Sequence, residues 1–222
     1  MEETYARDIT IQNATLKIQQ DSSKGIPGIV WDCALVYLGW LNKNFDTIKT
    51  KYKFESSKVL ELGSGTGISG LAFSLLKPKL LVFTDSKENL PQIRKNIEIN
   101  KSVLESNNVD LNSLKVEELL WGEKSGDAKK VLEKYGPFDI IMGSDLIYDD
   151  KAKHELLYTM EEIAKANPDI VVILGYTLHK PIDKKFFEYA LVNWSIEYIS
   201  EAELDEEFRA SDIGIAIMRY WG

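Results

Sequence analysis

Short apolar runs alternate along this chain with segments whose apolar residues recur at helical spacing. The helical spacing predicts helices near 68–76 and 151–166. Five buried strands are expected, at 58–62, 80–84, 114–119, 138–143 and 169–174. Strands joined through helices pair in parallel, and the helices then cover both faces of the sheet. The alternation therefore predicts an α/β fold around a mostly parallel sheet.

The last forty residues follow a different pattern. A helix is expected at 186–192, and two further apolar segments follow at 195–199 and 213–218 with no helical pattern between them. Parallel neighbours need a long crossover connection, whereas antiparallel neighbours do not. We therefore expect this final pair to be antiparallel. The result is a Rossmann-like, seven-stranded, mostly parallel sheet with an antiparallel C-terminal strand.

The length of 222 residues suits one such domain, which we assign to residues 25–222. Residues 1–24 are expected to form an N-terminal extension. Their weak alternation on both sides of Asn13-Ala14 is typical of a β-hairpin.

Charge and composition narrow the possible partners and compartments. The net charge of −8 disfavours nucleic acid and suits a basic protein partner. The densest group of lysines, at 49–53, is expected in a solvated loop. The start of the chain is acidic, and no run of about 18 apolar residues exists, so we expect neither a secretory signal nor a membrane span. A single cysteine, Cys33, fits a reducing compartment, and we expect a cytoplasmic monomer.

A metal site is not expected. The two histidines, His154 and His179, have no partner ligand at metal-binding spacing. By its position after the fifth strand alone, His179 can reach the substrate side of the expected site.

A glycine-rich loop, Glu61-Leu62-Gly63-Ser64-Gly65-Thr66-Gly67, follows the first buried strand. Glycines at such a turn let the backbone approach a ligand closely. Two ligands fit the pattern. Gly65, Gly67 and Gly70 have the G-x-G-x-x-G spacing of a dinucleotide site, with Asp85 about 20 residues after the first of them. S-adenosylmethionine is the other candidate.

Three features favour S-adenosylmethionine. The strand is expected to end at Leu62, so the loop begins at Gly63, and from there the dinucleotide spacing fails at Ile68. A carboxylate at Glu61 would repel a pyrophosphate but suits a ligand that carries an ammonium group. The tail also lacks the extra parallel strand and the substrate domain usual in dehydrogenases. Asp85, which ends the second strand, can then accept both hydroxyls of a ribose.

The fourth strand is followed by Ser144-Asp145-Leu146-Ile147-Tyr148. Ligands of open α/β sheets bind beyond the carboxyl ends of the strands, at the switch point that the first and fourth strands flank. Asp145 and Tyr148 are therefore expected beside the transferred methyl group, where they can orient an amine. Helix capping by Asp145 and packing by Tyr148 form the alternative. Leu146-Ile147 stand where methyltransferases of nucleobase amines have two prolines, which disfavours a nucleobase acceptor.

Four motifs in this order resemble one enzyme family, the seven-strand protein-lysine methyltransferases of the methyltransferase-like 21 group, also called methyltransferase family 16. The resemblance covers roughly residues 25 to 180. The four motifs are Val30-Trp31-Asp32-Cys33-Ala34, the glycine loop from Glu61 to Gly67, Leu119-Leu120-Trp121-Gly122, and Ser144 to Tyr148.

The resemblance implies a class I methyltransferase fold, S-adenosylmethionine as cofactor, and a lysine of a non-histone protein as acceptor, such as a translation elongation factor or a chaperone. It implies that Asp145 and Tyr148 act at the substrate lysine. Trp31 would line the cofactor pocket, Trp121 would contact its adenine side, and the backbone of Ser144 would lie against the cofactor. The residues expected to bind the cofactor are Trp31, Glu61, Gly63, Ser64, Gly65, Thr66, Asp85, Ser86, Trp121 and Ser144.

Other interpretations stay open at this point. Trp40 and Trp194 match no functional motif and are expected to serve packing, and Cys33 is expected to pack within its apolar helix. The acceptor can instead be a protein N-terminus, an arginine, a histidine or a small amine. An NAD(P)-dependent oxidoreductase, and a binding module without catalysis, are the remaining alternatives.

Overall fold

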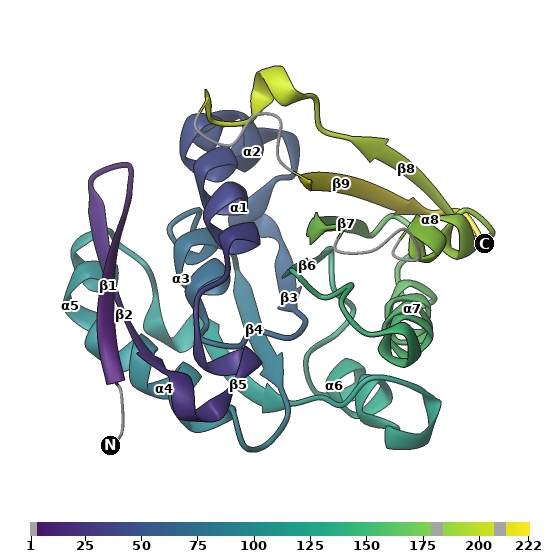
Figure 1. The fold of residues 1–222 in the computed structure, drawn as a ribbon, viewed down its shortest axis with the longest axis horizontal. Coiled ribbons are helices and arrows are strands. Elements are labelled where there is room, and N and C mark those ends of the chain that lie inside the picture. Colours follow the sequence, from purple (N-terminus) through teal and green to yellow (C-terminus); the bar gives the residue numbers. More distant parts are fainter. Residues whose placement is uncertain (1–3, 179–183, 207–211) are drawn as a thin grey trace.

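The computed structural model describes residues 4–178, 184–206 and 212–222, with the backbone alone at positions 150 and 151. Its centre is one seven-stranded sheet (Figure 1). The strands are β3 (Lys58–Glu61), β4 (Leu80–Asp85), β5 (Leu114–Glu118), β6 (Ile140–Ser144), β7 (Val171–Thr177), β8 (Trp194–Tyr198) and β9 (Ile213–Tyr220). They lie in the order β5-β4-β3-β6-β7-β9-β8. β9 runs antiparallel to both of its neighbours, whereas the other pairs are parallel. The predicted sheet is confirmed.

The central strands are short apolar runs because both of their faces are buried. Val59 of β3 and Leu81 of β4 belong to one apolar core, on one face of the sheet. Their neighbours Leu60 and Val82 point to the other face and belong to a second core. The chain order changes direction between β4-β3 and β6-β7, which places the switch point at the carboxyl ends of β3 and β6.

Helices cover both faces of the sheet, as expected (Figure 1). The first core is covered by α1 (Asp32–Lys43), α2 (Phe45–Lys51), α3 (Ile68–Ser74), α4 (Leu90–Ile99) and α5 (Lys101–Ser106). The second core is covered by α6 (Asp127–Tyr135), α7 (Asp150–Ala164) and α8 (Lys184–Ala190). Short 3-10 helices occur at Ser22–Lys24, Ile26–Gly28, Phe54–Ser56, Leu111–Ser113, Glu123–Ser125 and Glu201–Glu203.

Several local expectations need correction. The lysine group is not in a solvated loop, because Lys49 and Lys51 lie in the last turn of α2, where cations complement the helix dipole. Lys49 also pairs with Glu55 at 3.0 Å. The first central strand ends at Glu61, one residue earlier than expected. α6 was not predicted, because few apolar residues of its short sequence face the core.

The N-terminal segment forms the expected hairpin, with β1 (Thr4–Ile11) and β2 (Ala14–Asp21) paired antiparallel. Leu16 and Ile18 of β2 are fully buried in the first core. Two buried asparagines of the α4 region bond the backbone of β2. Asn96 bonds the N–H and the carbonyl of Gln19 at 2.9 and 3.0 Å, and Asn100 does the same for Lys17 at 2.7 and 2.8 Å. The side-chain amides thus satisfy a strand edge that has no neighbouring strand.

Within the described parts of the chain, no helix has the length and apolar character needed to cross a membrane.

Candidate functional site

A cavity of about 490 Å³ lies at the switch point. The carboxyl ends of β3, β4 and β6 form its floor, and the loop before α1 covers one side. It brings together eleven of the twelve residues expected to act in catalysis or cofactor binding. These are Trp31, Gly63, Ser64, Gly65, Thr66, Asp85, Ser86, Trp121, Ser144, Asp145 and Tyr148.

Three hydrogen bonds hold Ser64 and Gly65 of the glycine loop against β4. The N–H of Ser64 donates to the carbonyl of Thr84 at 2.9 Å, and the N–H of Thr84 donates to the Ser64 hydroxyl at 3.1 Å. The N–H of Gly65 donates to Asp85 Oδ2 at 2.8 Å. Gly63 has φ +57°, and a Cβ there would lie 2.7 Å from Leu146 and 3.2 Å from Trp121. Only glycine therefore allows this turn at the cavity wall.

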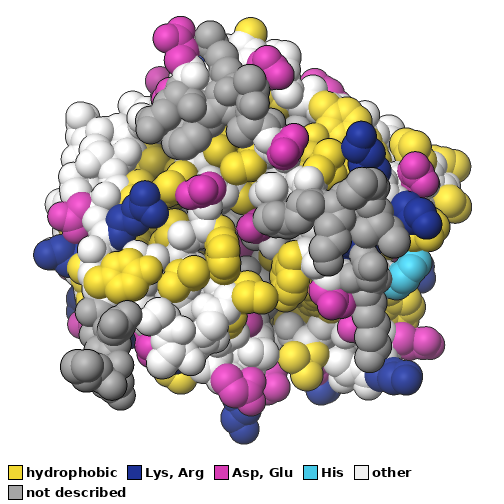
Figure 2. Space-filling model, viewed as in Figure 1, with side chains coloured by type: hydrophobic (Ala, Val, Ile, Leu, Met, Phe, Trp, Pro, Cys, Tyr) yellow, Lys and Arg dark blue, Asp and Glu magenta, His cyan; other side chains and the backbone are white. Residues whose placement is uncertain are grey.

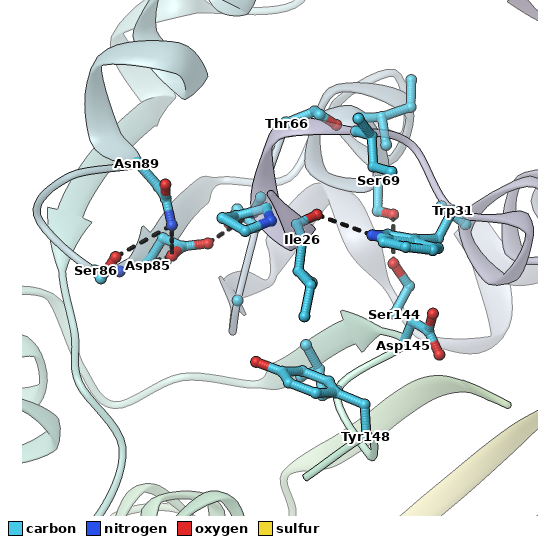
Figure 3. A pocket seen from close by; sticks show the side chains of 18 of the residues that line it. Ile26, Trp31, Thr66, Ser69, Asp85, Ser86, Asn89, Ser144, Asp145 and Tyr148 are labelled. Carbon is cyan, nitrogen blue, oxygen red and sulfur yellow. Dashed lines mark hydrogen bonds between the residues drawn. The ribbon is translucent and has the colours of Figure 1, made fainter. Parts of the chain in front are cut away.

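Asp85 is the centre of a small hydrogen-bond network (Figure 3). Its Oδ1 accepts from the N–H of Ser86 and from Asn89 Nδ2, both at 2.7 Å, and its Oδ2 accepts from Gly65. A carboxylate has about four acceptor positions, so these contacts leave roughly one for a ligand. Asn89 also lines the cavity and was not predicted. Its position four residues after Asp85, at the start of a helix, is the signal that sequence reasoning overlooked.

Glu61 is the one predicted site residue that does not line the cavity among the described residues. Its side chain is buried under the loop, where Oε1 accepts the N–H of Gly70 at 2.8 Å. Within the described structure, Oε2 has no hydrogen-bond partner. Burial raises the pKa of Glu61 to about 8, and the charge of Asp85 acts in the same direction. The side chain therefore turns toward α3, and a contact of Glu61 with a cofactor, direct or through water, stays a prediction.

Gly70 has a packing function that explains the dinucleotide-like spacing. A Cβ at this position would lie 2.2 Å from the Phe83 ring and 2.5 Å from Glu61 Oε2. Gly70 thus lets α3 pack closely on β4. The same close packing is required of the third glycine in a dinucleotide site, so the spacing alone does not discriminate between the two ligands.

Two tryptophans form parts of the cavity wall. Trp31 precedes α1, and its Nε1 donates to the carbonyl of Ile26 at 2.9 Å (Figure 3). This bond ties the indole to the loop that contains Ile26 and Pro27, both of which also line the cavity. Trp121 lies near Gly63 of the glycine loop, and Leu119 and Leu120 before it also line the cavity. Trp40 and Trp194 are buried in the core, as expected.

The end of β6 supplies the polar groups next to this wall. The Ser144 and Ser69 hydroxyls lie 3.2 Å apart and share a hydrogen bond (Figure 3). Asp145 has φ +58°, a left-handed conformation that aspartate adopts more readily than most residues. Its N–H donates to the carbonyl of Gly175 at 3.0 Å, which ties the turn to β7. Asp145 does not begin the following helix, where Asp149 Oδ1 instead accepts the N–H of Ala152 at 2.9 Å.

Tyr148 lines the cavity and is 42% exposed to solvent. Partial burial raises the pKa of Tyr148, and the carboxylates of Asp85, Asp149 and Asp145 raise it further. Its phenol is therefore neutral at physiological pH and can both donate and accept a hydrogen bond.

The charge of the cavity has one sign. Among its described lining residues, three carry a negative charge and none carries a positive one. The three are Asp85, Asp145 and Glu155. Acidic side chains are also spread over the face shown in Figure 2, with basic ones at separate points. Such a cavity favours a cationic ligand and disfavours a pyrophosphate.

Two other residues named in the sequence need a short report. Cys33 is buried, and burial raises the pKa of its thiol, so it serves packing as expected. His154 packs against Tyr189 with its ring tilted by 36° and 4.9 Å between ring centroids. His179 lies outside the described residues.

Comparisons with known proteins show which family and fold the chain resembles. The sequence profile of a lysine methyltransferase family matches residues 10–192. A protein N-lysine methyltransferase METTL21A from Danio rerio is 26% identical over 193 residues, which is 86% of this chain and 80% of the relative. An EEF1A lysine methyltransferase 3 from Xenopus tropicalis is 30% identical over 184 residues, or 82% of this chain and 72% of the relative.

A solved structure shares the fold. It is a TehB-like SAM-dependent methyltransferase from Corynebacterium glutamicum, with a TM-score of 0.54 and 14% sequence identity. The match covers 90% of this chain and 92% of that one.

Proposed function

The chain belongs to the lysine methyltransferase family, and on this premise we propose that it methylates a lysine side chain of a protein with S-adenosylmethionine as methyl donor. The observation that carries the proposal is the cavity itself. It combines two tryptophans, a glycine loop and three carboxylates, without a basic side chain among its described lining residues. A cationic methyl donor and a cationic lysine both fit this environment, whereas NAD(P) does not.

The cofactor side of the cavity is assigned from its floor and wall. We assign Asp85 to the ribose hydroxyls, through the acceptor position that its three hydrogen bonds leave. The glycine loop would pass along the cofactor with Gly63, Ser64, Gly65 and Thr66. Further contacts to the cofactor would come from Trp31, Ser86, Trp121 and Ser144. Glu61 would act indirectly, by fixing the first turn of α3 through Gly70. When bound, S-adenosylmethionine supplies a methyl group on a sulfonium sulfur.

The acceptor side is assigned to Asp145 and Tyr148. A free lysine has a pKa of about 10.4, and only its neutral amine is nucleophilic. A nearby carboxylate raises that pKa, so Asp145 is suited to binding and orienting the incoming ammonium rather than to removing its proton. The proton then leaves to water at the open cavity mouth. Tyr148 can hold the lysine nitrogen in line by a hydrogen bond, which favours displacement.

Charge and cysteine content support the proposed partner and compartment. A net charge of −8 fits a protein partner with a basic surface around the target lysine. Translation elongation factors and chaperones are the first substrates to test, and the Xenopus relative is named for EEF1A. We further propose that the protein is a cytoplasmic monomer that does not bind nucleic acid, with residues 25–222 as the catalytic domain and residues 1–24 as its extension.

Labelled S-adenosylmethionine, incubated with the protein and a cell lysate, tests the proposal. Peptide mass spectrometry of the labelled proteins would locate the methyl group. We expect it on a lysine Nζ. Label on a protein N-terminus, an arginine or a histidine would keep the methyltransferase but replace the acceptor. No transfer with a protein that binds the cofactor would favour a non-catalytic binding module.

A further inference from the structure

Glu155 is a cavity-lining carboxylate that the proposed function does not use. It lies near the start of α7, and its side chain is next to Gly122, the residue that follows Trp121. Its backbone carbonyl accepts the Thr159 hydroxyl at 2.9 Å, but no hydrogen bond or ion pair of its carboxylate is found among the described residues. An exposed carboxylate of this kind needs no partner in water, but a ligand that fills the cavity would displace that water.

The surroundings of Glu155 fix it against the segment that carries Trp121. The Thr159 hydroxyl also accepts the N–H of Gly122 at 2.9 Å, so one side chain joins α7 to this segment. Gly122 has φ +95°, and a Cβ there would lie 3.0 Å from Glu155 Cγ. The absence of a side chain at Gly122 therefore leaves the space in which the stem of Glu155 crosses toward the cavity.

The distribution of carboxylates around the cavity indicates which part of the cofactor Glu155 contacts. Asp85 lies at the end of β4, where the ribose is assigned, and Asp145 lies at the end of β6, where the lysine is assigned. Glu155 lies instead beside the apolar wall of Leu119, Leu120 and Trp121, which suits a flat purine ring. The exocyclic 6-amino group of adenine donates two hydrogens, and a carboxylate can only accept.

We propose that Glu155 accepts a hydrogen bond from the adenine 6-amino group and so selects adenine over a 6-oxo purine. The proposal rests on the proposed use of S-adenosylmethionine. A 6-oxo purine would present an acceptor to the carboxylate, which leaves both groups unsatisfied and disfavours binding. Glu155 is thus a specificity-determining residue on α7, outside the motifs that the sequence singled out.

Two ligands test the proposal, and they differ in the group at C6 and in the proton that N1 carries only in the 6-oxo form. S-adenosylhomocysteine and S-inosylhomocysteine carry a 6-amino and a 6-oxo group, respectively. Their dissociation constants are measured by calorimetry for the full-length wild type, Glu155→Gln and the control Glu123→Gln. Glu123 is an exposed acid near Gly122 that does not line the cavity. A glutamine can turn either its oxygen or its amide nitrogen toward the purine, so Glu155→Gln should accept both ligands.

We expect the wild type to prefer S-adenosylhomocysteine, and Glu155→Gln to reduce that preference about tenfold. The control should keep the wild-type ratio. A ratio in Glu155→Gln within twofold of wild type, in a protein whose melting temperature is unchanged, would overturn the proposal. If wild type binds neither ligand, the use of S-adenosylmethionine fails instead, so the two failures are distinguishable.

Discussion

Asp145 combines an acidic side chain with a left-handed backbone at the end of β6, where the lysine is expected to enter. Asp145→Asn keeps the shape and tolerates the positive φ, but removes the charge that would attract an ammonium. We expect kcat to fall at least about 100-fold, a loss typical of removing an orienting group. The dissociation constant of S-adenosylhomocysteine should change less than threefold, as measured by calorimetry.

Asp169→Asn is the matched control for this change. Asp169 is an exposed acid that precedes β7, at the amino ends of the parallel strands and away from the cavity. It should leave both quantities unchanged. Equal losses of cofactor affinity and turnover in Asp145→Asn would contradict the substrate role of Asp145.

Asp85 organises the glycine loop and, by assignment, the ribose. Asp85→Ala removes the acceptor of Gly65, Ser86 and Asn89 together with the acceptor left for the ligand. We expect S-adenosylhomocysteine to bind at least about tenfold more weakly in calorimetry, because hydrogen bonds to a charged group contribute about 1.5–3 kcal/mol each. Asp110→Ala is the control, since Asp110 accepts similar turn bonds from Asn112 away from the cavity. An unchanged dissociation constant in Asp85→Ala would count against the ribose assignment.

Glu61 makes the stability of the unliganded protein depend on pH. Its pKa is raised from 4.5 to about 8 in the folded state, so between these values the folded chain holds a proton that the unfolded chain has released. Stability therefore decreases as pH rises through this window. Glu61→Gln holds no titrating proton, so its melting temperature should fall less than that of wild type between pH 5 and pH 8. Parallel melting curves of the two proteins across this range would rule out the raised pKa.

At this scale the sequence predicted which residues gather, but not how each side chain points. Asp85, Asp145 and Tyr148 line the cavity because strand ends on one edge of a parallel sheet must converge. Glu61 also stands at a strand end, yet its rotamer turns it under the loop. Asn89 directly precedes α4, and its spacing from Asp85 was its only signal. Glu155 lies on the exposed surface of α7, where a polar residue gives no signal of function.

The N-terminal hairpin is the element whose attachment is least visible in the sequence. Asn96 of α4 bonds Gln19 of β2 and also the carbonyl of Thr66 in the glycine loop, at 2.8 Å. One buried amide therefore links the hairpin to the cofactor loop. Asparagines in a helix are usually solvated, so nothing in the local pattern indicates that these satisfy a strand edge.

Asn96→Ala tests this link. Asn96 is fully buried. Its loss would leave the N–H of Gln19 and the carbonyl of Thr66 without this hydrogen-bond partner and away from water. We expect the free energy of unfolding in urea to fall by about 2–4 kcal/mol, because each buried unsatisfied group costs roughly 1–3 kcal/mol. Asn112→Ala, at an exposed position, should change it by less than about 0.5 kcal/mol. Equal stabilities of the two variants would show that the hairpin is not held through Asn96.

The sheet as a whole was predictable because its signals are redundant. Each central strand is apolar on both faces, and the missing crossover before β9 requires an antiparallel final pair. The choice between two ligands was less accessible, since Gly70 packs α3 on β4 in either case. That choice depends on the carboxylates that surround the cavity, and their convergence exists only in the folded molecule.

The whole molecule should therefore distinguish the two ligands by its thermal stability. A ligand that binds the folded state alone stabilises it by about 2.7 kcal/mol at 100 times its dissociation constant. For a chain of this size, that corresponds to a rise of about 5–10 °C in melting temperature. We expect this rise with S-adenosylhomocysteine and none with NAD at equal concentration, because the acidic cavity repels a pyrophosphate. A shift with NAD alone would reverse the assignment of the glycine loop, and Asp85→Ala should weaken the response to whichever ligand binds.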